Sequence, residues 1–77
     1  MDRQAQILSL IRKVTKKDVN PSADESLFES GVLDSFALAD LVNALEKEFS
    51  IKIPDADLNP RKFDSLERIK SYVESRS

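Results

Sequence analysis

The segment Leu33-Asp34-Ser35-Phe36 places a hydroxyl group beside an aromatic ring at the expected start of a helix. A serine acts as a catalytic nucleophile only when a general base activates it. The chain contains no histidine, the most common such base, and no lysine stands three residues after Ser35. The usual catalytic triad therefore cannot form, and we expect no catalytic residue in this chain.

A serine at the beginning of a helix can instead be modified by another protein. The free N–H groups and the dipole of the first helical turn favour the negative charge of a phosphate ester. Ser35 is therefore suited to carry a phosphate-linked group. Asp-Ser is also an ordinary helix-capping arrangement. The same pattern recurs in Phe63-Asp64-Ser65-Leu66, where we interpret Ser65 as structural.

The helix that follows Ser35 has one apolar stripe. Its members recur at helical spacing within about 100° of arc and predict a helix from Asp34 or Ser35 to Phe49; they are Leu38, Leu41, Val42, Leu45 and Phe49. Phe36 falls about 160° from this stripe, on the side of Asp40, Asn43 and Lys47. A single exposed aromatic residue is common. Acidic neighbours make Phe36 a candidate anchor for a partner protein.

Two further helices flank this one. The helical spacing of Ile7, Leu8, Ile11 and Val14 predicts a first helix over about residues 3–17. A last helix should open within FDSLER at 63–68 and run to about Glu74. We expect Asp64 to cap the last helix, in a capping box with Glu67. Residues 55–59 have room for about one helical turn, and 51–53 should be an extended loop. The single glycine, Gly31, should supply a backbone conformation that other residues resist.

These elements predict an all-α fold, a small four-helix bundle with three main helices and one short helix. We expect residues 1–77 to form one small domain. The chain has no cysteine, so it can form neither a disulfide nor a thiolate metal site, and we expect no metal ligands. Apolar runs are too short for direct membrane insertion, so a cytoplasmic protein is expected.

Charge is unevenly distributed along the chain. The net charge is −2, but residues 24–48 hold seven acidic residues against Lys47 alone, a net −6. An acidic surface disfavours nucleic acid as a partner and favours a basic protein surface. We expect the chain to bind its partners weakly and to be a monomer.

Over nearly its whole length the chain resembles the acyl carrier proteins. The matching stretches are SLFESGVLDSF at 26–36, ALADLVNALEKEFSIKIPD at 37–55 and FDSLERIKSYV at 63–73. The resemblance implies that Ser35 receives 4′-phosphopantetheine from coenzyme A through a separate Mg²⁺-dependent phosphopantetheinyl transferase. An acyl or aminoacyl group would then be bound as a thioester to this phosphopantetheine arm. An activating ligase would load it, and an acyltransferase or synthase would accept it. In such carriers the position of Phe36 and the second helix contact partner enzymes, which implies a partner surface of Asp34, Phe36, Asp40, Asn43 and Lys47.

Gly31 precedes Ser35 by four residues, whereas fatty-acid carriers have glycine three residues before the serine. This spacing is similar to the D-alanyl carrier proteins of teichoic-acid modification and to stand-alone carriers for amino acids or specialised acyl groups. The sequence leaves open which cargo applies, because the space inside a bundle depends on packing. It also leaves open an unmodified helical interaction module that uses the same helix face.

Overall fold

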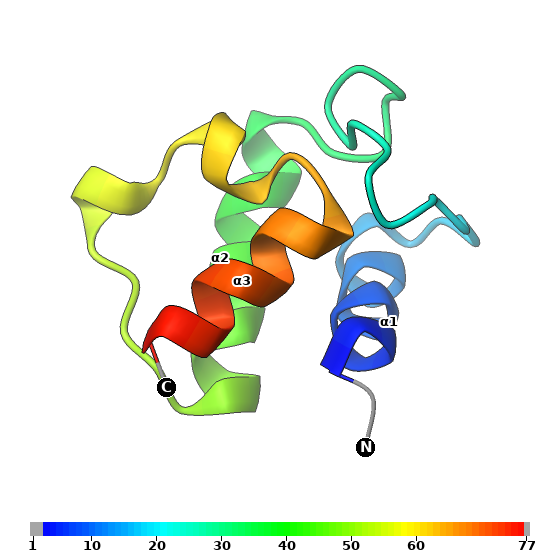
Figure 1. The fold of residues 1–77 in the computed structure, drawn as a ribbon. Helices are drawn as coiled ribbons and strands as arrows, with labels where there is room; N and C mark the ends of the chain where they lie inside the picture. Colours follow the sequence, from blue (N-terminus) through cyan, green and yellow to red (C-terminus); the bar gives the residue numbers. More distant parts are fainter. Residues whose placement is uncertain (1–2, 77) are drawn as a thin grey trace.

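The computed structural model describes residues 3–76 and is all-helical over that range (Figure 1). It has three α-helices, which are α1 (Arg3–Thr15), α2 (Ser35–Phe49) and α3 (Leu66–Arg76), and two short 3₁₀ helices, which are η1 (Asp55–Asp57) and η2 (Pro60–Phe63). The expected all-α class is confirmed. The expected four-helix count is not confirmed: within the described residues η1 lies in the segment where one short helix was expected, and η2 is a second 3₁₀ helix that was not expected. No helix within the described residues is long and apolar enough to cross a membrane.

The apolar stripes of the three α-helices meet in one core. α2 buries four of its five stripe residues, and only Phe49 is partly exposed, with the Arg3 guanidinium 5.8 Å from its ring centroid. α1 and α3 contribute their own stripes, and the residues 51–53 lie in an extended loop as expected. The helix-borne and loop residues buried with the α2 stripe are Ile7, Ile11, Leu27, Val32, Leu33, Ile51, Ile53, Phe63, Leu66, Ile69 and Val73.

The long connection between α1 and α2 folds back on the core. Leu27 is fully buried, and its N–H donates to the carbonyl of Asp64 at 2.6 Å. The Asp64 carboxylate accepts hydrogen bonds from Ser26 Oγ at 2.8 Å and from the Phe28 N–H at 3.3 Å. Asp64 thus ties this connection to the segment before α3.

The expected capping of α3 by Asp64 is wrong. Ser65 Oγ accepts the hydrogen bond from the Arg68 N–H at 3.1 Å, so Ser65 satisfies the first turn of the helix. Asp64 is engaged with residues of the connection instead, and the Glu67 N–H donates to the carbonyl of Ala23. The cap is therefore one residue later than the sequence pattern suggested.

Positive φ angles mark the ends of two helices and one turn. α1 stops at Thr15, two residues earlier than expected, and Lys16 adopts the left-handed φ of 57° that ends many helices. Ser50 does the same after α2, at φ 54°. Gly31 has φ 83°, which confirms its expected role. The Lys17 ammonium donates to the carbonyl of Gly31 at 3.3 Å, so the end of α1 contacts the turn before α2.

Candidate functional site

Ser35 is the first residue of α2, and it is exposed. The preceding Asp34 has an extended backbone, and its Oδ1 accepts a hydrogen bond from the Ala37 N–H at 2.8 Å. The carbonyl of Asp34 also accepts from the Leu38 N–H at 2.8 Å, which closes the first turn. Because Asp34 supplies the cap, the Ser35 hydroxyl is not needed for it.

Ser65 has the opposite environment, although its local sequence is the same. Its side chain is only 5% exposed and its Oγ caps α3. The interpretation of Ser65 as structural is therefore confirmed. Of the two Asp-Ser pairs that begin helices, only the first leaves its hydroxyl where another protein can reach it.

The residues around Ser35 fit a phosphate-linked group. In an α-helix the first N–H groups have no intrahelical carbonyl partner, so those of Ser35 and Phe36 stand at the positive end of the α2 dipole. An exposed hydroxyl at such an end can form a phosphodiester whose charge the helix stabilises. Within residues 3–76 no group of three or more His, Cys, Asp or Glu side chains is placed so that it could hold a metal ion.

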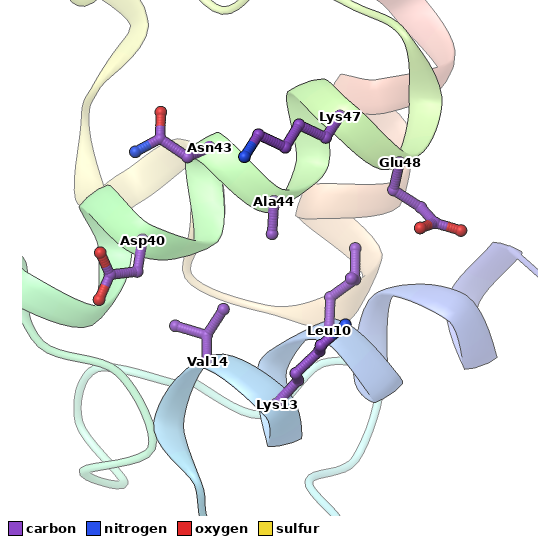
Figure 2. A pocket seen from close by; sticks show the side chains of 8 residues that line it. All are labelled: Leu10, Lys13, Val14, Asp40, Asn43, Ala44, Lys47 and Glu48. Atoms are coloured by element: carbon purple, nitrogen blue, oxygen red, sulfur yellow. The ribbon is translucent and has the colours of Figure 1, made fainter.

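Phe36 is 85% exposed, as its place on the helical wheel predicted. Asp40, Asn43 and Lys47 are exposed as well. The structure places these three along one wall of a groove between α1 and α2, with a volume of about 370 Å³ (Figure 2). They therefore lie together, in line with Phe36 at the helical spacing i, i+4, i+7 and i+11.

The second wall of this groove comes from α1 and was not anticipated. Leu10, Lys13 and Val14 line it opposite α2, and Ala44 and Glu48 complete the α2 side (Figure 2). Leu10 lies outside the predicted core stripe of its helix, and such an apolar residue is the one sequence signal that could have indicated this wall. The groove carries both signs of charge, so it is not the purely acidic surface suggested by composition.

A smaller groove of about 280 Å³ lies on another side of α2, facing the segment that contains η1. Ala39, Val42 and Glu46 line it from α2, and Ile53 and Leu58 from the other side. The Ile53 N–H donates to Glu46 Oε2 at 2.9 Å, which fixes the two sides together. Helical spacing aligns Ser35 with Ala39, Val42 and Glu46, whereas Phe36 is aligned with the first groove. By this spacing Ser35 and Phe36, at the N-terminus of α2, lie on the sides of the helix that carry the smaller and the larger groove respectively.

Comparison with known proteins identifies the class. The family model for the phosphopantetheine attachment site matches residues 5–73. The D-alanyl carrier protein of Streptococcus suis is 34% identical over 73 residues, which cover 95% of this chain and 92% of the relative. That of Leuconostoc mesenteroides is 31% identical over 75 residues, covering 97% and 96%. That of Lactobacillus acidophilus is 29% identical over 75 residues, covering 97% and 95%.

The chain is a carrier protein, without catalytic activity of its own, on which partner enzymes such as transferases and ligases act. It belongs to the acyl carrier protein family, defined by the phosphopantetheine attachment site. Its cofactor is covalently attached 4′-phosphopantetheine, which supplies the thiol that holds an acyl group as a thioester. A chain with no cysteine has no thiol of its own for this purpose.

Proposed function

We propose that Ser35 is the attachment residue for 4′-phosphopantetheine and that the cargo is D-alanine. The observation that carries the attachment site is the exposure of Ser35 at the start of α2, where Asp34 already caps the helix. The buried Ser65 has the same local sequence but a hydroxyl engaged with Arg68. Of these two serines, Ser35 is therefore the one that a modifying enzyme can reach.

In the attachment reaction, Ser35 Oγ forms a P–O bond to the phosphorus of coenzyme A that bears the pantetheine. The P–O–P linkage breaks, adenosine bisphosphate leaves, and the serine proton passes to a base of the transferase. The N–H groups of the first turn of α2 then face the new phosphodiester charge. This chain needs to offer only an accessible hydroxyl, in agreement with its lack of a general base.

D-alanine as cargo is supported by the relatives, which are named D-alanyl carrier proteins and match almost the whole chain. The Gly31 to Ser35 spacing agrees with that assignment. The proposed partners are a phosphopantetheinyl transferase, an aminoacyl-activating ligase and an acyltransferase. Another amino acid or a specialised acyl group is the alternative cargo.

The proposed partner surface consists of Asp34, Phe36, Asp40, Asn43 and Lys47. Its support is the exposure of all five side chains and the position of the last three along the groove between α1 and α2. We further propose a monomeric, cytoplasmic carrier whose single domain spans 1–77, with η1 and η2 together occupying the place of the fourth, short helix.

The test begins with loading. The purified protein is incubated with coenzyme A and a broad-specificity phosphopantetheinyl transferase, and its intact mass is measured. We expect a gain of one phosphopantetheine in the wild type and none in Ser35→Ala. Ser9→Ala, which removes another exposed serine hydroxyl, is the control and should be modified normally. An equal gain in Ser35→Ala would place the arm elsewhere.

The second stage tests the cargo. The holo-protein is offered D-alanine, L-alanine and octanoate with ATP and the corresponding adenylating ligases. A mass gain that is fastest with the D-alanine ligase supports the proposal. Efficient loading only by a fatty-acid ligase would contradict it and favour the acyl alternative.

A further inference from the structure

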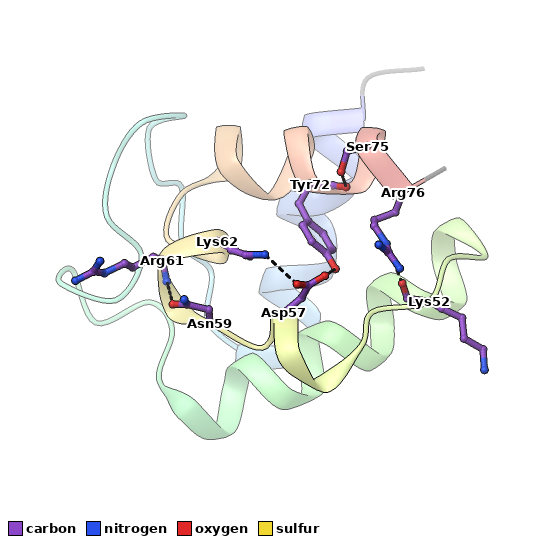
Figure 3. A network of polar contacts seen from close by, with 8 residues as sticks. All are labelled: Lys52, Asp57, Asn59, Arg61, Lys62, Tyr72, Ser75 and Arg76. Atoms are coloured by element: carbon purple, nitrogen blue, oxygen red, sulfur yellow. Dashed lines mark hydrogen bonds and ion pairs between the residues drawn. The ribbon is translucent and has the colours of Figure 1, made fainter.

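Phe63, the last residue of η2, is the largest of the fully buried side chains. η2 packs against both α2 and α3. In Figures 1 and 3 it lies beside the N-terminal end of α2, the end that Ser35 begins. Phe63 is therefore a core residue carried by a turn that contacts both helices, and this turn lies by the helix end from which an attached arm would start (Figure 1).

The ring is held in place by its neighbours. The Tyr72 ring contacts it edge to face, with centroids 5.1 Å apart and planes at 61°. Leu41, Leu66 and Ile69 belong to the same core cluster as Phe63 and are at most 1% exposed. Interiors of this kind are packed as densely as organic crystals, so an incoming chain has to displace a side chain that is already there.

Polar contacts fix η2 from one side through Asp57 of η1. The Lys62 ammonium lies 2.9 Å from Asp57 Oδ1, and the Tyr72 hydroxyl donates to Asp57 Oδ2 at 2.7 Å (Figure 3). Both oxygen atoms of the Asp57 carboxylate therefore accept a hydrogen bond, one from Lys62 of η2 and one from Tyr72 of α3. The Lys62 contact therefore links η2 to η1, and the Tyr72 contact links η1 to α3.

Two more contacts fix the first residues of η2. The Asn59 side chain accepts from the Arg61 N–H at 3.0 Å, and Arg68 Nη1 of α3 donates to the Arg61 carbonyl at 3.2 Å. Pro60 at the start of the turn adds a restricted φ. The whole turn is thus anchored to α3 on one side and to η1 on the other.

We propose that η2 is a plug that keeps apolar chains out of the core, and that Phe63 is the residue that determines this specificity. The proposal rests on the proposed function, in that the cargo is attached through Ser35. Burial of each methylene favours the buried form by about fourfold, so a chain with access to the core would enter it. With Phe63 in place the core offers no room for an apolar chain. The favoured cargo is then small and polar and remains in solvent, as a D-alanyl group would.

The test compares short and long cargoes on the same arm. Wild type, Phe63→Ala and Phe49→Ala are modified by the transferase with acetyl-coenzyme A or octanoyl-coenzyme A. Phe49→Ala is the matched control, because Phe49 is partly buried at the opposite end of α2. Thioester cleavage by hydroxylamine is followed by intact mass, and the methyl groups of Leu41, Leu66 and Ile69 are followed by NMR.

In the wild type we expect the two thioesters to be cleaved at equal rates and the core methyl signals to be unchanged by the octanoyl chain. In Phe63→Ala, burial of a few methylenes should slow octanoyl cleavage about tenfold relative to acetyl and shift those signals. Phe49→Ala should behave as the wild type. Octanoyl protection or shifted core methyls in the wild type would overturn the plug. A folded Phe63→Ala without protection would overturn the role of Phe63.

An unloaded protein provides a test that does not depend on Ser35. A cavity left by an aromatic side chain binds benzene when it is apolar and enclosed, so benzene should shift the core methyls of Phe63→Ala and not those of the wild type. If Phe63→Ala does not fold, Phe63→Leu takes its place and should bind benzene more weakly. Failure of loading contradicts the proposed function alone, whereas benzene entering the wild-type core contradicts the plug alone.

Discussion

The Tyr72 hydroxyl donates a 2.7 Å hydrogen bond to Asp57 Oδ2, and this contact joins α3 to η1. Burial, and next the hydrogen bond to Asp57, raise the pKa of Tyr72 to about 12. The same hydrogen bond, followed by that from Lys62, lowers the pKa of Asp57. The pair thus favours the protonated phenol and the ionised carboxylate, which are the forms that the hydrogen bond needs.

The first prediction concerns alkaline pH. Tyr72 is the only tyrosine in the chain, so tyrosinate absorbance reports it alone. In the unfolded chain its pKa is near the ordinary 10.0, and in the folded protein it is about 12. Between these values the folded state keeps a proton that the unfolded state has lost, so the free energy of unfolding should fall as the pH rises through this interval.

Urea denaturation at a series of pH values measures this decline, and Tyr72→Phe should reduce it. Asp57→Asn removes the negative charge beside the phenol and should move the absorbance midpoint of the folded protein back toward the ordinary tyrosine value. A wild-type midpoint already at the ordinary value would contradict the buried, hydrogen-bonded phenol.

The second prediction separates recognition from stability at Phe36. With 85% of the residue exposed, Phe36→Ala should change the free energy of unfolding by less than about 0.5 kcal/mol. If Phe36 anchors partners, the rate of arm transfer at low carrier concentration should fall about tenfold, equivalent to about 1.4 kcal/mol. Leu58→Ala, which removes another exposed apolar side chain, is the control. Equal rates for Phe36→Ala and the wild type would remove Phe36 from the surface used by the transferase.

The third prediction separates two roles of Asp34, the capping of α2 and the proposed recognition of its charge by partner enzymes. Its carboxylate caps α2 through the Ala37 N–H, so Asp34→Ala should destabilise the protein by about 1 kcal/mol and increase hydrogen exchange in the first turn of α2. Asp34→Asn keeps a capping oxygen and should retain nearly all of that stability. If partners recognise the charge, Asp34→Asn should still slow arm transfer. Wild-type transfer by Asp34→Asn would leave capping as the only role of Asp34.

The sequence predicted α2 and its exposed N-terminus because both depend on local information. A 3.6-residue period fixes which face of α2 is buried, and the side chains next to the helix start decide its cap. Phe36 on the outside and the Leu38 to Leu45 stripe on the inside follow from that period alone. η2 also has a local sequence signal for a helix start: Asn59 is a capping residue, and Pro60 follows it at the first helical position.

The features that were missed depend on contacts between distant segments. The α1 wall of the groove comes from Leu10, Lys13 and Val14, and nothing near them in the sequence identifies α2 as their neighbour. The side chains of Asp64 and Ser65 can both cap a helix. Ser65 caps α3 because the Asp64 carboxylate is engaged by Ser26, which lies 38 residues before it in the sequence. A pattern read along one helix cannot contain that information.

The fourth prediction tests that long-range contact. Asp64→Ala removes the acceptor of two hydrogen bonds, from Ser26 Oγ and the Phe28 N–H, and should lower the free energy of unfolding by about 2 kcal/mol. Because these bonds hold the connection that leads into α2, amide exchange in Leu27–Leu33 should also increase more than in α1. Asp24→Ala, which removes an exposed carboxylate of the same connection, should do neither. If Asp64→Ala instead loosened only the first turn of α3, Asp64 would act as the cap of that helix, and the assignment of this role to Ser65 would be wrong.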